Sequence, residues 1–194
     1  FDGRPVLLRQ RADGWHAVVG LPLDTPVGEQ TIQIGPEGNS RAQTFVVGPK
    51  AYPEQRLTIK NPKMVTPPTD ELARIAEERE RQLAIRSRFR DVSVNRVDLD
   101  LPADGRLSSR FGLRRIFNGE PRAPHTGLDV AVPTGTPIRA PADGVVSLVD
   151  DLYFNGKTVF VDHGQGFVSM VCHLDQARVE VGQKVARGER LGDA

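Results

Sequence analysis

A histidine and an aspartate four positions apart, His125 and Asp129, can offer an imidazole nitrogen and a carboxylate oxygen to one metal ion. In an extended strand the two side chains would stand about 13 Å apart, too far to share an ion bound at about 2 Å. Pro124 before the pair and Gly127 within it argue against a helix. We therefore predict a bent loop that enters a strand at Leu128. The spacing alone also fits an ordinary loop, because many loops contain a histidine and an aspartate.

Three further histidines and one cysteine have side chains that can do chemistry. His16 lies on a predicted hairpin and is interpreted as a surface residue, and His163 lies at a hairpin tip, which favours a structural role. His173 ends an apolar strand, where a lone histidine is usually half-buried. Beside a metal it can act as a general base or donate to a developing oxyanion. Strand alternation turns Cys172 to the opposite face, as a small core residue and not a nucleophile.

Residues 1–48 predict a compact accessory β domain. Short apolar-rich runs at 6–9 and 15–20 flank an Asp-Gly turn signal, and two more runs follow at 31–34 and 44–47. Four short strands in this length suggest a small sandwich of immunoglobulin-like type.

Residues 49–96 are expected to form a proline-stiffened linker with one helix at about 70–88. Thr69 is a suitable N-cap, and acidic residues follow it in the first turn. One helix face is predicted to be apolar, through Leu72, Ile75, Ala76 and Leu83. The opposite face, residues 77–81, is charged and is predicted to be solvated. We interpret the segment as a rigid arm between two domains, and we expect no nucleic-acid role for Arg86, Arg88 and Arg90.

Residues 97–194 predict an antiparallel all-β domain. Apolar runs lie at 137–141, 144–149, 158–162 and 167–174, with shorter pieces at 179–181 and 182–192. Glycine-containing turns at 143–144, 155–156 and 164–166 separate the long runs.

Composition narrows the class of protein. The 194 residues carry 26 Lys and Arg against 25 Asp and Glu, so bulk binding to nucleic acid or to a membrane surface is not expected. A single cysteine excludes an internal disulfide framework and a cysteine-rich zinc site. No apolar run approaches the roughly 20 residues that span a bilayer. The chain starts at Phe1, so a signal peptide or a membrane anchor upstream of residue 1 is compatible with it.

Four motifs occur in an order that resembles the lysostaphin-type (LytM-type) zinc endopeptidases, which cut peptide bridges in bacterial peptidoglycan. These motifs are Ser109-Arg110-Phe111-Gly112-Leu113-Arg114, His125-Thr126-Gly127-Leu128-Asp129-Val130, the stretch 135–146 and Cys172-His173-Leu174. The resemblance covers about the second half of the chain. It implies an antiparallel β-sheet core with an open groove. The N-terminal half looks like the accessory β domain and helical linker of Gram-negative, envelope-located members.

The resemblance also implies the site. His125 and Asp129 would be Zn²⁺ ligands, and His173 would be a catalytic histidine that does not bind the metal. The substrate would be the peptide stems or cross-bridges of peptidoglycan, and the location the periplasm or cell envelope. The family has a further His-x-His motif, which supplies the third ligand and another catalytic histidine. The strand that leads to this motif would begin at about 192–194, so the motif would either follow Ala194 or be lacking. The family often has tyrosine two residues before the catalytic histidine, where this chain has Val171.

Three alternatives stay open. A relative without metal ligands would be a regulator that activates a cell-wall amidase, although both visible ligand positions are intact here. Stretches 140–146 and 181–189 also resemble biotinyl or lipoyl carrier domains, in which Lys157 would be the modified lysine. Finally, an arm that includes Tyr52, Gln55 and Asn61 could fold across the groove and inhibit the enzyme, or it could be a plain spacer.

Overall fold

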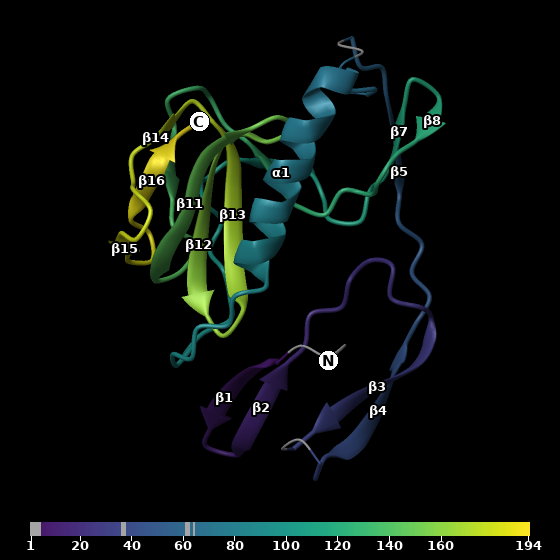
Figure 1. Ribbon diagram of the computed structural model, residues 1–194, viewed down its shortest axis with the longest axis vertical. Coiled ribbons are helices and arrows are strands. Elements are labelled where there is room, and N and C mark those ends of the chain that lie inside the picture. The colour runs from purple at the N-terminus through teal and green to yellow at the C-terminus, as the bar shows by residue number, and fades with distance from the viewer. Residues whose placement is uncertain (1–4, 36–37, 61–62, 64) are drawn as a thin grey trace.

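The computed structural model describes residues 5–35, 38–60, 63 and 65–194. These residues form many short strands and one long helix, so the predicted mostly β class is confirmed (Figure 1). Asn61, named for the arm, lies outside the described residues. In the part of the chain that is described, no helix is both long and apolar enough to cross a membrane.

The central element is a four-stranded antiparallel sheet in the order β13-β12-β11-β15. Its strands are β13 (Phe167–Leu174), β12 (Gly156–Gly164), β11 (Gly144–Leu152) and β15 (Lys184–Val185). A second sheet, β10-β16-β14, consists of β10 (Pro137–Arg139), β16 (Arg190–Asp193) and β14 (Gln176–Ala177). Alternate β-branched residues of the first sheet, such as Val159 and Val161, pack with Ile138 and Leu191 of the second in one core.

The helix α1 (Thr69–Arg86) crosses the other face of the central sheet (Figure 1). It begins one residue earlier than predicted, because Pro68 is the N-cap and Thr69 is already helical. The predicted apolar face was wrong: Leu72 and Leu83 are 49% and 40% exposed, whereas Glu78 and Ile85 are buried. The sheet explains the difference, since it presents polar groups to the helix.

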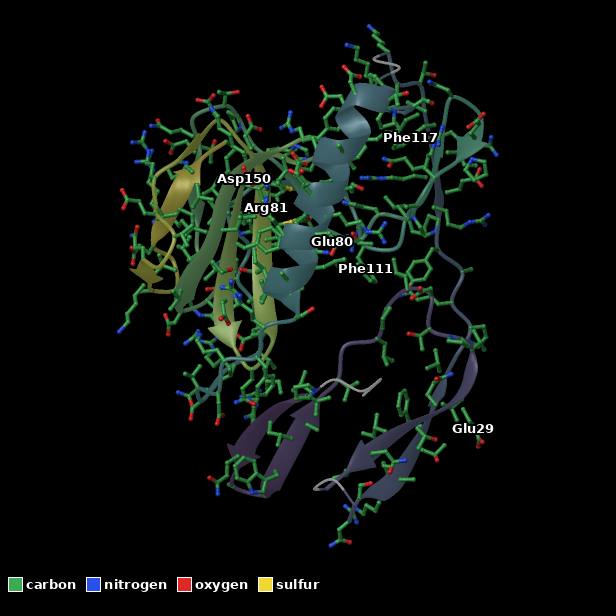
Figure 2. All side chains as sticks on the ribbon, viewed as in Figure 1. Glu29, Glu80, Arg81, Phe111, Phe117 and Asp150 are labelled. Atoms are coloured by element: carbon green, nitrogen blue, oxygen red, sulfur yellow. The ribbon has the colours of Figure 1, made fainter. Side chains whose placement is uncertain are left out.

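Arginine side chains make most of the polar contacts that α1 and the residues after it form with the sheet. The ion pair between Arg81 Nη2 and Asp150 Oδ2 (2.8 Å) can be followed in Figure 2. The Arg86 guanidinium lies 5.6 Å from the centre of the buried Phe160 ring, and Arg90 Nε donates to Asp162 Oδ2 at 3.1 Å.

The buried Glu78 carboxylate, predicted to be solvated, accepts from Arg74 Nε (2.7 Å) and from the backbone N–H of Tyr153 (2.8 Å). A charged side chain therefore fixes the middle of the helix to the end of β11.

The N-terminal β unit consists of two antiparallel hairpins. β1 (Leu7–Arg11) pairs with β2 (Gly14–Val18), and β3 (Gly28–Ile34) pairs with β4 (Arg41–Val47). Most of their residues are exposed. The Gln165 carboxamide attaches β1 to the β12–β13 turn, because it accepts from Leu8 N (2.9 Å) and donates to the carbonyls of Leu8 (3.3 Å) and Val92 (3.0 Å).

A small sheet in the order β5-β7-β8 stands apart from the core. The connecting segment supplies β5 (Glu54–Leu57), which runs parallel to β7 (Arg114–Phe117), and β8 (Glu120–Pro121) completes a hairpin with β7. This parallel pair departs from the predicted all-antiparallel domain. It also adds a strand to a segment in which we predicted only a helix.

Candidate functional site

The predicted metal ligands lie side by side. His125 Nε2 and Asp129 Oδ1 are 3.2 Å apart. Two ligand atoms that each bind one tetrahedral zinc ion at about 2 Å are separated by about 3.3 Å, so this distance suits a shared ion. As predicted, residues 122–127 form neither helix nor strand, and the strand begins one residue later than the predicted Leu128. The backbone bends there and enters β9 (Asp129–Ala131).

The strand β6 (Arg106–Ser109) positions both residues. Ser109 is the register partner of Asp129, and its buried hydroxyl lies 2.9 Å from His125 Nδ1. The carbonyl of Arg110 is 3.2 Å from the same Nδ1. A carbonyl can only accept, so this contact places the imidazole proton on Nδ1. Nε2, which faces Asp129, is thereby left with the lone pair that a metal ligand needs.

The backbone around His125 is held by the segment that follows β6. Gly112 N donates to His125 O (2.7 Å), and His125 N donates to Leu113 O (2.9 Å). Gly112 has φ +86°, and a Cβ there would lie 2.1 Å from the Tyr52 ring, so only glycine lets that ring pack on this backbone. Tyr52 of the arm is thus packed next to the His125 segment. Among the described residues, no hydrogen bond or ion pair joins Tyr52 or Gln55 to His125 or Asp129.

An arginine that sequence analysis did not select completes the surroundings of Asp129. Arg115 Nη2 lies 3.7 Å from Asp129 Oδ2, the carboxylate oxygen that does not face His125. Ser109 was also missed as an orienting residue. Ser109 belongs to the resembling motif and Arg115 comes directly after it, but only the register of β6 with β9 and the position of Arg115 beside Asp129 reveal the contacts.

His173 lies on a β-bulge at the end of β13. Lys157 pairs with Leu174 and Val159 with Val171, so Cys172 and His173 together face the single residue Thr158. His173 is exposed and has φ +60°, a conformation that is costly for a residue with a Cβ and is typical of functional sites. In the described part of the chain its imidazole makes no hydrogen bond.

Cys172, next to His173, feels the charge of Asp129. Burial raises the pKa of its thiol, and the negative charge of Asp129 raises that pKa further, although a hydrogen bond with Asn155 opposes both effects. The thiol is half-buried and not part of the core, and its raised pKa disfavours the thiolate that a nucleophile needs. The predicted strand alternation between Cys172 and His173 does not hold, because the bulge interrupts it.

Of the other two histidines, His16 is a surface residue as predicted, whereas His163 lies within β12 and not at the predicted hairpin tip. His163 is buried, with Nδ1 2.7 Å from Asp143 O and Nε2 2.9 Å from Ser169 Oγ, and burial lowers its pKa. His16 is on the exposed strand β2, 3.0 Å from Asp13. Within the described residues, no group of three or more His, Cys, Asp or Glu side chains could hold a metal ion. His125 and Asp129 therefore fit zinc in donor type and spacing and supply two of the three protein ligands that catalytic zinc sites use.

Known protein families match both ends of the chain. Peptidase family M23 matches residues 123–194, and the peptidase family M23 N-terminal domain matches residues 1–50. The peptidoglycan DD-endopeptidase ShyA of Vibrio cholerae is 39% identical over 103 residues, which is 52% of this chain and 24% of ShyA. An uncharacterized metalloprotease of Haemophilus influenzae is 38% identical over 94 residues, 47% of this chain and 20% of that protein. The matched part thus spans a quarter or less of these curated relatives.

A solved structure extends the similarity to the whole chain. A crystal structure from Pseudomonas aeruginosa, described as a peptidase M23, is 42% identical and superposes with a TM-score of 0.79. The match covers 100% of this chain and 72% of that one. Because the similarity includes the N-terminal hairpins, the linker and the central sheet, this chain belongs to peptidase family M23.

Proposed function

We propose that this protein is a zinc-dependent endopeptidase that hydrolyses the peptide cross-links of bacterial peptidoglycan. The observation that carries the proposal is the 3.2 Å pair of His125 Nε2 and Asp129 Oδ1, with the imidazole proton held on the far nitrogen. The names of the relatives, a peptidoglycan DD-endopeptidase and a metalloprotease, support the substrate and the metal.

Different residues of this chain would bind the metal, orient its ligands and transfer protons. His125 and Asp129 would hold zinc, which supplies an activated water and polarises the scissile carbonyl. Ser109 and the Arg110 carbonyl keep the His125 ring in its orientation. The exposed His173, at the bulge that ends β13, would transfer a proton or donate to the oxyanion. Since peptidoglycan lies outside the cytoplasmic membrane, the proposal includes export to the periplasm or cell envelope.

The test combines metal content with activity. The purified protein should bind zinc and release peptides from peptidoglycan. His125→Ala and Asp129→Ala should each lose both properties, and His173→Ala should lose activity but keep zinc. His16→Ala, on the exposed β2 strand, is the matched control. Equal hydrolysis by all five proteins would refute the enzyme assignment. Zinc-independent stimulation of a cell-wall amidase would favour a regulator instead.

Inhibition by the arm is a separate proposal, which the packing of Tyr52 against Gly112 supports. If the arm restricts access to the site, Tyr52→Ala should raise the rate of peptidoglycan cleavage. An unchanged or lower rate would show that this contact does not inhibit.

A further inference from the structure

Unpaired polar atoms are concentrated in the small sheet β5-β7-β8. Among the described residues, five buried side-chain nitrogen or oxygen atoms have no hydrogen-bond partner. Three of them belong to this sheet and its continuation: Gln55 Oε1, Arg115 Nε and Arg122 Nε. Of the other two, Arg187 Nη1 already lies 2.7 Å from an Asp100 oxygen. A buried polar atom without a partner costs free energy, so a cluster of three calls for an explanation.

The pairing register puts these three side chains on one face. Gln55 is the parallel partner of Arg115. Arg122 N donates to Arg115 O at 2.9 Å, which continues the antiparallel β7–β8 register by one residue. Directly paired residues of neighbouring strands point to the same side of a sheet. Because Arg115 Nη2 lies 3.7 Å from Asp129 Oδ2, this face is turned toward the metal-ligand pair.

Two directly opposed arginines repel each other, so the pair is unfavourable unless an anion compensates it. The compensation in the structure is incomplete. Asp129 is 3.7 Å from Arg115, which is beyond hydrogen-bond distance. Glu120, the 3.0 Å partner of Arg122, is mostly exposed. Neither acid reaches the two Nε–H groups.

The three unpaired atoms also define which ligand would satisfy them. Two N–H donors in guanidinium groups suit a carboxylate, which accepts several hydrogen bonds at once. Gln55 Oε1 can only accept, so it needs an N–H group close to that carboxylate. A peptide residue that carries both a free α-carboxylate and its own amide N–H offers this combination.

We propose that Gln55, Arg115 and Arg122 form a carboxylate-binding subsite next to His125 and Asp129. It selects peptides in which the residue after the scissile bond has a free α-carboxylate. This inference deepens the proposed function, on which its role in hydrolysis rests. It also gives the linker strand β5 a part in substrate recognition.

Binding to the metal-free protein tests the subsite without relying on catalysis. The probes are N-acetyl-D-alanyl-D-alanine and the same dipeptide with a C-terminal amide, titrated into the full chain and followed by NMR. We expect the carboxylate form to bind about tenfold more tightly, as for one charge-assisted hydrogen-bonding group. Arg122→Gln should abolish this preference, and Arg122→Lys, which keeps the charge but not the planar donors, should retain part of it.

Arg114→Gln is the matched control. Arg114 is the exposed neighbour of Arg115 on β7, and alternation places its side chain on the opposite face, beside Glu54. The Arg114→Gln variant removes the same charge as Arg122→Gln and should leave the preference for the carboxylate dipeptide intact. Equal binding of the two dipeptides by the unaltered protein, or the same loss in Arg114→Gln as in Arg122→Gln, would overturn the subsite. Circular dichroism establishes that each variant is folded.

Hydrolysis then separates the two proposals. With zinc, the carboxylate-bearing substrate should have a lower KM than its amide, and Arg122→Gln should equalise the KM values with little change in kcat. Hydrolysis of both substrates with equal KM would refute the subsite but not the endopeptidase. Selective binding without any hydrolysis would refute the endopeptidase but not the subsite.

Discussion

The central sheet β13-β12-β11-β15 and the small sheet β5-β7-β8 differ in how deeply their residues are buried and in how fully their polar atoms are hydrogen-bonded. In the central sheet, Val159, Phe160 and Val161 have at most 1% of their surface exposed. In the small sheet, no strand residue is buried, and three polar atoms on one face of its strands and their continuation lack partners. The central sheet therefore supplies most of the stability, whereas the small sheet keeps polar atoms without partners, which we propose bind a ligand.

The largest effect on stability is expected in the central sheet. Phe160→Ala should lower the free energy of unfolding by about 3–5 kcal/mol, because it leaves a cavity under α1. Phe117→Ala, at a half-buried position of β7, should cost about 1 kcal/mol. Urea denaturation measures the free energy of unfolding of both variants. Equal losses would show that the two sheets contribute equally to stability.

The next effect concerns the attachment of α1. Glu78→Ala should cost about 1–3 kcal/mol, because the backbone N–H of Tyr153 loses its acceptor. Glu80→Ala, on an exposed position of the same helix (labelled in Figure 2), should change stability by no more than about 0.5 kcal/mol. Hydrogen exchange should show faster opening of α1 only in the first variant. If both variants exchange alike, the buried carboxylate does not hold the helix.

A smaller and more local effect is expected where the arm meets the site. Gly112→Ala should cost about 1 kcal/mol for its positive φ and should push the Tyr52 ring away. Hydrogen exchange should accelerate in β5 but not in β12. The double variant Gly112→Ala with Tyr52→Ala should relieve the clash and leave only the backbone cost. Unaltered exchange in β5 would show that Tyr52 does not anchor it.

The smallest effect is a pH dependence. Burial lowers the pKa of His163 in the folded protein below its ordinary value of 6.5. The unfolded chain therefore takes up a proton first, so this residue reduces stability as pH falls from 6.5 toward the lower folded pKa, and has no such effect above pH 7. The unfolding midpoint should drop between pH 7.5 and 5.5 and drop less in His163→Gln. The same slope in both proteins would assign it to another group.

The strands of the central sheet were largely predictable because their alternating apolar residues report burial directly. The bent His125–Asp129 loop followed from the same kind of local reasoning. The helix face was mispredicted because apolar periodicity assumes an apolar partner, and α1 meets carboxylates and a backbone N–H instead. The β5–β7 pair and the Arg115–Asp129 contact depend on segments distant in sequence, so no local pattern could reveal them.

The bulge in β13 has a consequence for how this strand tolerates change in length. Cys172 and His173 share one partner, so deleting either residue would restore an unbroken ladder between Val171 and Leu174. Such a deletion would remove or displace the hydrogen bond that His173 N donates to Asn155 O (2.9 Å), and His173 would lose its left-handed conformation or disappear. The extra residue is therefore what places His173 at an irregular, exposed end of β13 and lets its backbone reach Asn155.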